Sequence, residues 1–316
     1  MSYTTYVTTW GPNPQDQIQD MINKSVLKSN TRVVLAFASF NFPSDYSYIP
    51  GFDSLSMEEV QEITNLVHSH GGKISLSIGG ATYPFNGSDL YSQPGNLANN
   101  INQVLIKCGF DGVDFDIEDS YSVVPNDFAE QAASLINTLR NLNPALYITL
   151  TTPAQAWAKG CYQQNLLNLT IGSINAWQPM EYDLWIQSGF TYYDQIVYDL
   201  NFYMSTWGVN PEKIILGLMP GDDDSKNDLT LESALNLTTY SVENKLQGIM
   251  TWDADFDSEG LDGNAPYAYS LGIESILNKN NIKKLSRYYF EDSDSDNNET
   301  LPSKRRRVIF TCKIQE

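Results

Sequence analysis

Apolar residues gather along the chain in eight short runs that have the length and composition of β-strands. Several runs, such as residues 33–37 and 214–216, are apolar throughout, which is typical of strands that helices cover. The predicted strands comprise residues 4–10, 32–40, 73–80, 112–118, 147–153, 174–183, 213–218 and 247–253.

Helical patterns lie between most of these runs. Ser56 and Glu59 form a capping-box pattern ahead of apolar positions spaced as on one helix face, and two glycines at 71–72 end this helix. Alternating strands and helices, repeated eight times, predict an α/β protein that closes into a (β/α)8 TIM barrel. Further helical patterns cover residues 125–144, 193–207, 231–246 and 267–278.

The fourth predicted strand carries a row of acids, because residues 111–118 read Asp-Gly-Val-Asp-Phe-Asp-Ile-Glu. Side chains alternate in a strand, so Asp114, Asp116 and Glu118 should share one face, at steps of roughly 6–7 Å. Such a row lowers stability, because like charges repel and burial removes their water. It therefore indicates acid–base chemistry, in which one acid holds a proton while another stays ionised. Asp111 is out of step with the row, and we expect a structural role for it.

Functional residues of a barrel gather at the carboxyl ends of its strands, and three other strands offer candidates there. The third predicted strand ends in Gly79 and Gly80, which let the backbone pass close to a neighbour or a ligand. The sixth carries Met180-Glu-Tyr-Asp183, in which Glu181 should point away from the barrel axis. The eighth carries Trp252.

These motifs together resemble glycoside hydrolase family 18, the chitinases and their relatives. Residues 77–80 and 111–118 match the family's two signature strands, and residues 180–183 and Trp252 match its sixth and eighth strands. The four motifs follow one another in the family's order, and the resemblance covers roughly residues 1–280.

The resemblance implies catalytic roles for four residues. Glu118 would protonate the glycosidic oxygen and then activate water. The 2-acetamido oxygen of the substrate would attack C1, so no second carboxylate acts as the nucleophile. Asp116 would hold the acetamido N–H and stabilise the positively charged intermediate, while Asp114 would share a proton with Asp116 and tune it. Tyr182 would hydrogen-bond the acetamido oxygen beneath C1.

The resemblance also implies substrate-binding roles. Asp183 would help to hold the reacting sugar, and Trp252 would form the apolar floor beneath it. Gly79 and Gly80 line the mouth, as does Met180, a residue that more often packs than reacts. No metal-ligand pattern and no cofactor motif appears, so we expect neither a metal nor a cofactor.

The leading expectation is therefore an endochitinase that cleaves β-1,4-linked N-acetylglucosamine polymers by substrate-assisted, retaining catalysis. Only residues 220–247 separate the last two predicted strands, which identifies a short form without the α+β insertion that walls the cleft in many family members. An open, shallow cleft and internal cleavage of long chains follow. Two alternatives stay open: an endo-β-N-acetylglucosaminidase acting on N-glycans, which uses the same chemistry, and a non-catalytic chitin-binding lectin, which usually lacks the equivalent of Glu118.

Composition limits the partners. The formal net charge is −19, and the chain from Glu291 onward holds six acidic against five basic residues, so residues 1–290 carry about −18. This charge argues against a nucleic acid bound by the barrel and suits a neutral or cationic substrate. We assign residues 1–285 to the catalytic barrel and residues 286–316 to a polar, disordered tail with a basic cluster.

The remaining features define expectations about location and assembly. The start of the chain has no signal-peptide pattern and no run is long enough to span a membrane, so we expect a cytoplasmic or non-classically exported monomer without membrane contact. Lys304–Arg307 leaves a nuclear location open. Trp10, Trp157 and Trp185 are either sugar-stacking platforms or ordinary core and rim aromatics.

Overall fold

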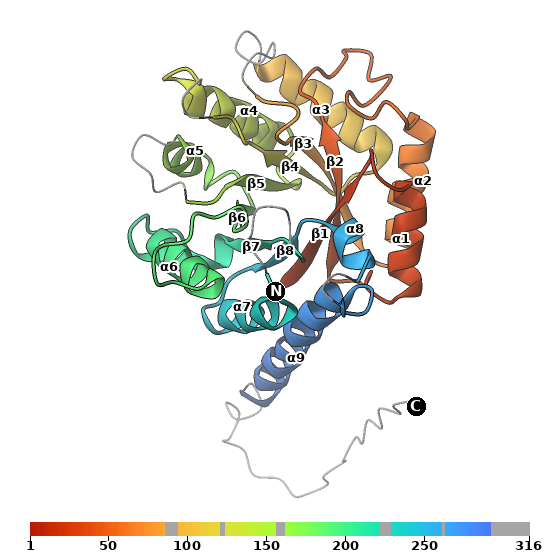
Figure 1. Ribbon diagram of the computed structural model, residues 1–316. Helices are drawn as coiled ribbons and strands as arrows, with labels where there is room; N and C mark the ends of the chain where they lie inside the picture. Colours follow the sequence, from red (N-terminus) through yellow and green to blue (C-terminus); the bar gives the residue numbers. More distant parts are fainter. Residues whose placement is uncertain (86–93, 121–123, 156–161, 222–228, 261–262, 292–316) are drawn as a thin grey trace, which may run out of the picture.

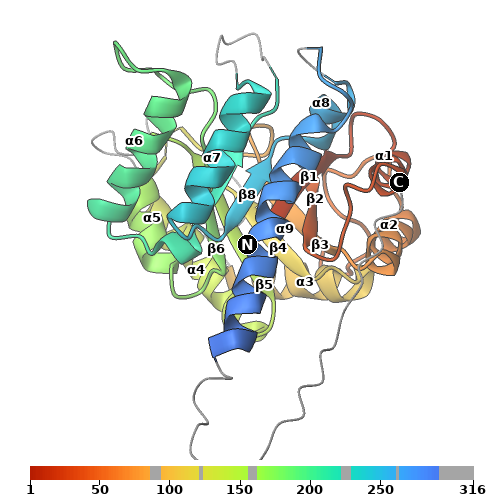
Figure 2. The ribbon, with the colours of Figure 1, turned by 90° about the horizontal axis from the view of Figure 1, so that it is seen from below.

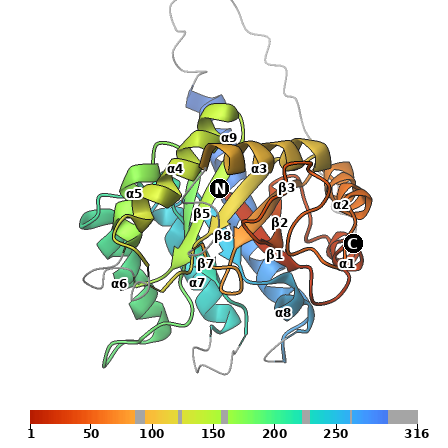
Figure 3. The same cartoon turned by 90° about the horizontal axis from the view of Figure 1, so that it is seen from above.

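The computed structural model describes residues 1–85, 94–120, 124–155, 162–221, 229–260 and 263–291. Eight parallel strands form a closed barrel in which each strand pairs with the next along the chain and β1 pairs with β8. Helices surround the strands (Figures 1 and 3), with α1 and α2 on one side of the barrel and α5 and α6 on the other. The predicted (β/α)8 TIM barrel is confirmed.

All eight predicted runs overlap a strand, although most of the strands are shorter than predicted. The fifth matches residue for residue, whereas the sixth occupies only the middle of residues 174–183. The strands are β1 (Ser2–Thr8), β2 (Thr31–Ala38), β3 (Lys73–Gly79), β4 (Gly112–Asp116), β5 (Tyr147–Pro153), β6 (Ala176–Met180), β7 (Ile215–Leu218) and β8 (Gly248–Thr251).

The helices include all five that the sequence patterns single out and four that they do not: α1, α3, α5 and the short α8. Ser56 and Glu59 form the predicted capping box at the start of α2. The helices are α1 (Pro14–Asn23), α2 (Met57–Ser69), α3 (Pro94–Cys108), α4 (Phe128–Leu142), α5 (Gln163–Thr170), α6 (Tyr192–Ser205), α7 (Leu231–Glu243), α8 (Ala254–Ser258) and α9 (Ala268–Glu291).

The last helix, α9, runs further than the sequence pattern indicated. It extends past the predicted end at residue 278, reaches the first residues of the predicted tail, and projects beyond the neighbouring helices in Figure 2. The rest of that tail, with the basic cluster Lys304–Arg307, lies outside the described residues, as does Trp157. The division between barrel and tail stays a prediction. Within the described part of the chain, no helix has the length and apolar character that crossing a membrane requires.

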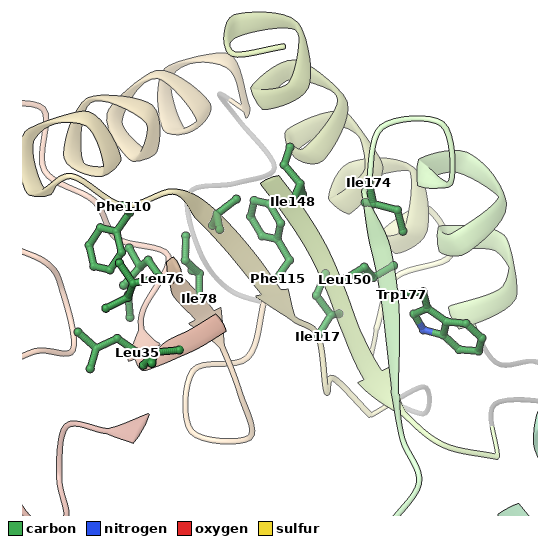
Figure 4. Close-up of a cluster of buried hydrophobic side chains, with 14 of the residues drawn as sticks. Leu35, Leu76, Ile78, Phe110, Phe115, Ile117, Ile148, Leu150, Ile174 and Trp177 are labelled. Carbon is green, nitrogen blue, oxygen red and sulfur yellow. The ribbon is translucent and has the colours of Figure 1, made fainter. Parts of the chain in front are cut away.

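The main hydrophobic core lies between the barrel strands and the helices. Figure 4 shows Leu76, Ile78, Phe115, Ile117 and Leu150 among the side chains that the strands direct into this layer. All five are fully buried, and burying a side chain of this size contributes about 1.5–3 kcal/mol. The apolar half of the alternating strand therefore anchors β4, which leaves its acids facing the barrel axis.

A close backbone contact joins β3 to β4 beside this core. Gly79 has a φ of 116°, and a Cβ atom at this position would lie 2.0 Å from the carbonyl oxygen of Asp116. A side chain at Gly79 would therefore push β4 out of position.

We predict that Gly79→Ala lowers the free energy of unfolding by at least about 3 kcal/mol, because the methyl group collides with backbone and the φ angle disfavours alanine. Denaturant unfolding measures this change. The matched control is Gly95→Ala at the start of α3, where an added Cβ meets nothing within 4 Å, so a small gain or no change is expected. Equal stability of the two variants would contradict the close contact.

Candidate active site

The acid row enters the barrel mouth from β4. Asp114 and Asp116 lie within the strand, which ends at Asp116. The extended backbone continues one residue further, since the amide of Ile117 donates to the carbonyl of Thr151 at 2.9 Å. Glu118 therefore keeps the predicted alternation although it lies beyond the strand. Its side chain is half-buried, whereas that of Asp114 is fully buried.

Asp114 is surrounded by neutral hydrogen-bond donors from four strands. Burial raises the pKa of Asp114, and these donors oppose the rise because they favour the charged form. A carboxylate can exist at this depth because every neighbour donates to it. The donors are the hydroxyls of Tyr6 (2.8 Å), Ser77 (2.7 Å), Thr149 (2.6 Å) and Thr151 (2.7 Å) and the side-chain amide of Gln178 (3.2 Å).

Asp116 has the opposite environment. It is 3% exposed, and its Oδ1 atom has no hydrogen-bond partner among the described residues. Burial raises the pKa of Asp116 well above its ordinary value, and the charges of Glu118 and Asp114 raise it further. These influences favour the protonated form of Asp116, and its Oδ1 is a buried acceptor that no described residue satisfies.

Glu118 has a raised pKa for related reasons. Burial is the largest cause, and the charges of Asp183 and Asp119 add to it, while a hydrogen bond from the backbone amide of Ala81 partly offsets it. A carboxyl group of raised pKa at the edge of a cavity can donate a proton near neutral pH.

Glu118 shares a pocket of about 170 Å³ with the end of β6. Met180, Tyr182 and Asp183 line the same pocket. The charges of Asp116 and Glu118 raise the pKa of Tyr182 in addition to its burial, which is the largest cause, so the phenol remains a hydrogen-bond donor. The structure thus brings Glu118, Tyr182 and Asp183 together, as the sequence predicted. Of these three side chains, Asp183 is the most exposed to solvent.

A strip of aromatic rings leads away from this pocket across β8, β2 and β1. The ring of Trp252 stacks on Phe37, with centroids 5.5 Å apart, and Phe37 stacks on Trp10 at 5.8 Å. Trp10 is 61% exposed and lines a second pocket of about 410 Å³ together with Phe37 and Tyr83. The sequence reasoning missed Phe37 and Tyr6, whose position at the mouth depends on how the strands pair.

A second exposed indole lies on the opposite side of the mouth. Trp185, 65% exposed, follows β6, while Trp10 follows β1. The side chain of Gln155 makes two hydrogen bonds to the backbone of Trp185. Its Nε2 donates to the Trp185 carbonyl at 2.7 Å, and its Oε1 accepts from the Trp185 amide at 2.9 Å. Gln155 gave no sequence signal, because its role depends on this long-range contact.

Glu181 points away from the mouth, as predicted, and is fully buried beside α6. Burial and the charge of Asp199 raise its pKa well above the ordinary value, while the hydroxyl of Tyr203 favours its charged form. The same hydroxyl accepts a hydrogen bond from the backbone amide of Gln155 at 3.0 Å. The buried face of α6 is therefore linked through Tyr203 to Gln155, whose side chain hydrogen-bonds the backbone of Trp185.

Gly79, the last residue of β3, and Gly80, the next residue, position other site residues. The amide of Gly80 donates to the Asp116 carbonyl at 2.9 Å, and a Cβ atom on Gly80 would lie 2.7 Å from the ring of Phe37. Contact of Gly79 or Gly80 with a substrate stays a prediction. Asp111 lies at the opposite end of β4, where it accepts hydrogen bonds from Lys73 and from the amide of Ile74, which is the structural role expected of it.

Within the described ranges, no group of three or more His, Cys, Asp or Glu side chains is arranged to hold a metal ion. The chemistry that this arrangement offers is proton transfer by a carboxyl of raised pKa next to a buried acid with an open oxygen.

Comparisons with known proteins identify the family and the fold. Residues 2–221 match the sequence model described as Glycosyl hydrolases family 18. No curated protein sequence matches the chain.

Solved chitinase structures share the fold. Active domain 2 of the thermostable chitinase from Pyrococcus furiosus, solved as catalytic-site mutants complexed with chito-oligosaccharides, has a TM-score of 0.69 and 18% identity, covering 88% of this chain and 95% of that chain. The Group IV chitinase from Ostrinia furnacalis in complex with allosamidin has a TM-score of 0.66 and 18% identity, covering 88% and 99%. At these identities the likeness shows the barrel fold alone.

We predict that Glu118→Gln lowers the pKa of Asp116, because the substitution removes one of the two negative charges that raise it. Carbon NMR of the Asp116 carboxyl, followed through a pH titration, measures the shift. Glu62→Gln on the exposed side of α2 is the control and should leave the titration in place. An Asp116 titration that is the same in wild type and Glu118→Gln would contradict the coupling of the row.

Proposed function

The chain belongs to glycosyl hydrolases family 18 and is a chitinase-like glycoside hydrolase, and we propose that it is an endochitinase that cleaves β-1,4 linkages inside N-acetylglucosamine chains. The observation that carries this proposal is the contrast along the acid row. Asp114 is fully hydrogen-bonded, Asp116 keeps a buried oxygen without a partner, and Glu118 has a raised pKa at the pocket edge.

The proposed first chemical step assigns a role to each of these positions. The carboxyl of Glu118 gives its proton to the glycosidic oxygen while the bond from that oxygen to C1 breaks. The acetamido oxygen of the same sugar forms a new bond to C1, which yields a positively charged oxazolinium ring. Tyr182 donates a hydrogen bond to the acetamido oxygen and fixes it beneath C1.

The neighbouring acids balance the charge that develops. Asp116 accepts the acetamido N–H on its open oxygen. One proton held by Asp114 and Asp116 together moves toward Asp114, where the four hydroxyls among its five neighbours can turn to accept from the protonated form, so that Asp116 is ionised when the ring becomes positive. In the second step, Glu118 removes a proton from water as it attacks C1, which opens the ring with retention of configuration.

Cleavage within a chain is supported by two exposed indoles at the mouth. Trp10 and Trp185 present exposed rings on opposite sides of the pocket, so a chain can lie across the barrel and contact both. The segment between β7 and β8 is short and contains α7. The same chemistry would serve an endo-β-N-acetylglucosaminidase, and hydrolysis of chitotetraose but not of a high-mannose glycopeptide would favour the chitinase. A non-catalytic lectin is disfavoured by the presence of Glu118.

We predict that Glu118→Gln lowers kcat on soluble chitin oligomers by about 10²–10⁴-fold, because the glutamine amide cannot donate the proton. Chromatography of the products measures the loss, and calorimetric binding of the same oligomers should be retained. Asp45→Asn on an exposed loop is the control and should keep wild-type turnover. Near-normal turnover by Glu118→Gln would remove the assigned role.

We further predict that Asp116→Asn lowers kcat by about 10²–10³-fold, because it removes the charge that faces the positive intermediate. The free energy of unfolding at neutral pH should stay the same or rise, since an acid of raised pKa destabilises the folded state at pH values above its unfolded pKa. Steady-state kinetics and denaturant unfolding measure the two effects. An unfolded Asp116→Asn protein would instead make Asp116 a structural residue.

A further inference from the structure

A separate pocket lies at the end of the barrel opposite the mouth, where the strands begin. Ser2, Lys73 and Tyr147, the first residues of β1, β3 and β5, line it together with Arg32 of β2. It has a volume of about 380 Å³, and none of the described residues that line it is acidic. On a chain with a net charge of −19, a pocket with two cations and no lining acid attracts anions that the rest of the surface repels.

Arg32 reaches this pocket from inside the barrel. Side chains alternate along β2, and Val34 packs with Tyr6 in the inner apolar cluster, so Arg32 also faces the barrel axis. Its guanidinium lies over the ring of Tyr147, with Cζ 3.9 Å from the ring centroid. The hydroxyl of Tyr147 is hydrogen-bonded in turn to the side chain of Gln247 at 2.9 Å. Stacking therefore holds Arg32 in place and leaves the edge of the planar group to hydrogen-bond partners.

The donors of Arg32 are largely unused, in contrast to those of Arg140 at the same end of the barrel. Arg140 donates four hydrogen bonds, three to backbone carbonyls and one to the side chain of Asn175. Arg32 donates one, from Nη1 to the hydroxyl of Ser75 at 2.9 Å, and within the described ranges no carboxylate forms an ion pair with it. A guanidinium carries five N–H donors, so Arg32 can bind a further acceptor that Arg140 cannot.

Burial of this charge without a counter-ion is unfavourable. Arg32 is half-buried, and burial lowers the pKa of its guanidinium, because the loss of water disfavours the charged form. The influences of Tyr147 and Asp111 oppose this fall. The carboxylate of Asp111 is engaged elsewhere, with Lys73 at 2.9 Å and His68 at 2.8 Å. An anion in the pocket would supply the missing partner of Arg32.

Two buried hydroxyl groups point to a ligand independently of the charges. Ser2 lines the pocket, and Thr4 pairs in register with Arg32 on the adjacent strand, which lies about 4.7–4.9 Å away. Thr4 is only 1% exposed. Neither Oγ of Ser2 nor Oγ1 of Thr4 has a hydrogen-bond partner in the described part of the chain. Buried polar atoms are normally paired, so these two hydroxyls indicate an occupant that accepts hydrogen bonds.

We propose that this pocket binds a phosphate group through Arg32 and Lys73, with the hydroxyls of Ser2 and Thr4 as further donors. Phosphate offers more acceptor oxygens than a carboxylate, and two of them match the planar edge of a guanidinium. The pocket volume leaves room for a small molecule that carries the phosphate as an ester, so free phosphate and a phosphate monoester share this chemistry. The inference does not depend on the proposed function, because the pocket lies at the end of the barrel opposite the mouth.

Thermal unfolding of the full chain tests the proposal, because a ligand that binds only the folded state raises Tm. Inorganic phosphate and glycerol phosphate are each added to about 20 mM at about pH 7.5, where phosphate is mostly a dianion, with NaCl of matched ionic strength as the reference. We expect Tm to rise by about 2–6 °C with one or both. The larger rise identifies the source of the phosphate group. No rise above the NaCl reference with either anion would overturn the proposal.

Two charge-matched variants locate the binding. Arg32→Met keeps a long side chain on the ring of Tyr147 and removes the donors, so the affinity for phosphate measured by calorimetry should fall about tenfold. Lys24 is exposed after the last residue of α1, at the same end of the barrel but outside the pocket. Lys24→Gln should change the affinity by less than about twofold. Equal affinities in the two variants would assign binding to general positive charge and contradict the role of Arg32.

Two further measurements separate a binding role of Arg32 from a structural one. Without phosphate, Arg32→Met should melt at the wild-type temperature or above it, because a buried charge without a partner has been removed. A variant that melts lower and still gains the full rise from phosphate would make Arg32 a structural residue. Arg32→Lys keeps the charge but not the planar pair of donors, and it should weaken binding about threefold to fivefold. Unchanged affinity in Arg32→Lys would exclude the paired contact.

Backbone amide NMR places the ligand directly. During titration with inorganic phosphate, the shift changes should centre on Ser2, Thr4 and Arg32, and the amides of Asp116 and Trp252 should stay where they are. Shift changes centred on the mouth would place the anion in the other end of the barrel and refute the site.

Discussion

The rest of the site depends on the burial of three carboxyl groups in one row. Desolvation and mutual repulsion make such a row unfavourable, and the barrel accommodates it by treating each acid differently. Asp114 receives five neutral hydrogen bonds, Asp116 receives none on one oxygen, and Glu118 lies at the edge of the pocket. These unequal surroundings separate the proton affinities of chemically similar groups, which is what acid–base catalysis requires.

Much of this arrangement was visible in the sequence because it depends on local periodicity. Because side chains alternate along a strand, the sequence predicted that Asp114 and Asp116 lie on the side opposite Phe115. The same alternation predicted that Glu181 points away from the mouth and that Asp111 is not part of the row. The eight strand-like runs with helices between them sufficed to predict a closed barrel, since few other folds alternate in this way.

What the sequence could not predict depends on contacts between distant segments. Tyr6 and Gln178 meet Asp114 only when β1 and β6 close around β4, and Phe37 reaches Trp252 only through the pairing of β2 and β8 with β1. Strand ends were predicted too long because apolar residues continue into the loops at the mouth. The continuation of α9 to Glu291 was missed because polar residues reduce its periodicity.

The burial of Glu181 has a consequence for how this protein can diverge. Glu181 connects the mouth to the inner face of α6, where Asp199 and Tyr203 are also fully buried, and Tyr203 contacts the residue that fixes Trp185. Replacements on that buried face of α6 would shift the exposed indole of Trp185 without changing any residue of the acid row. The rim of the mouth can thus change over evolutionary time while the acid row stays the same.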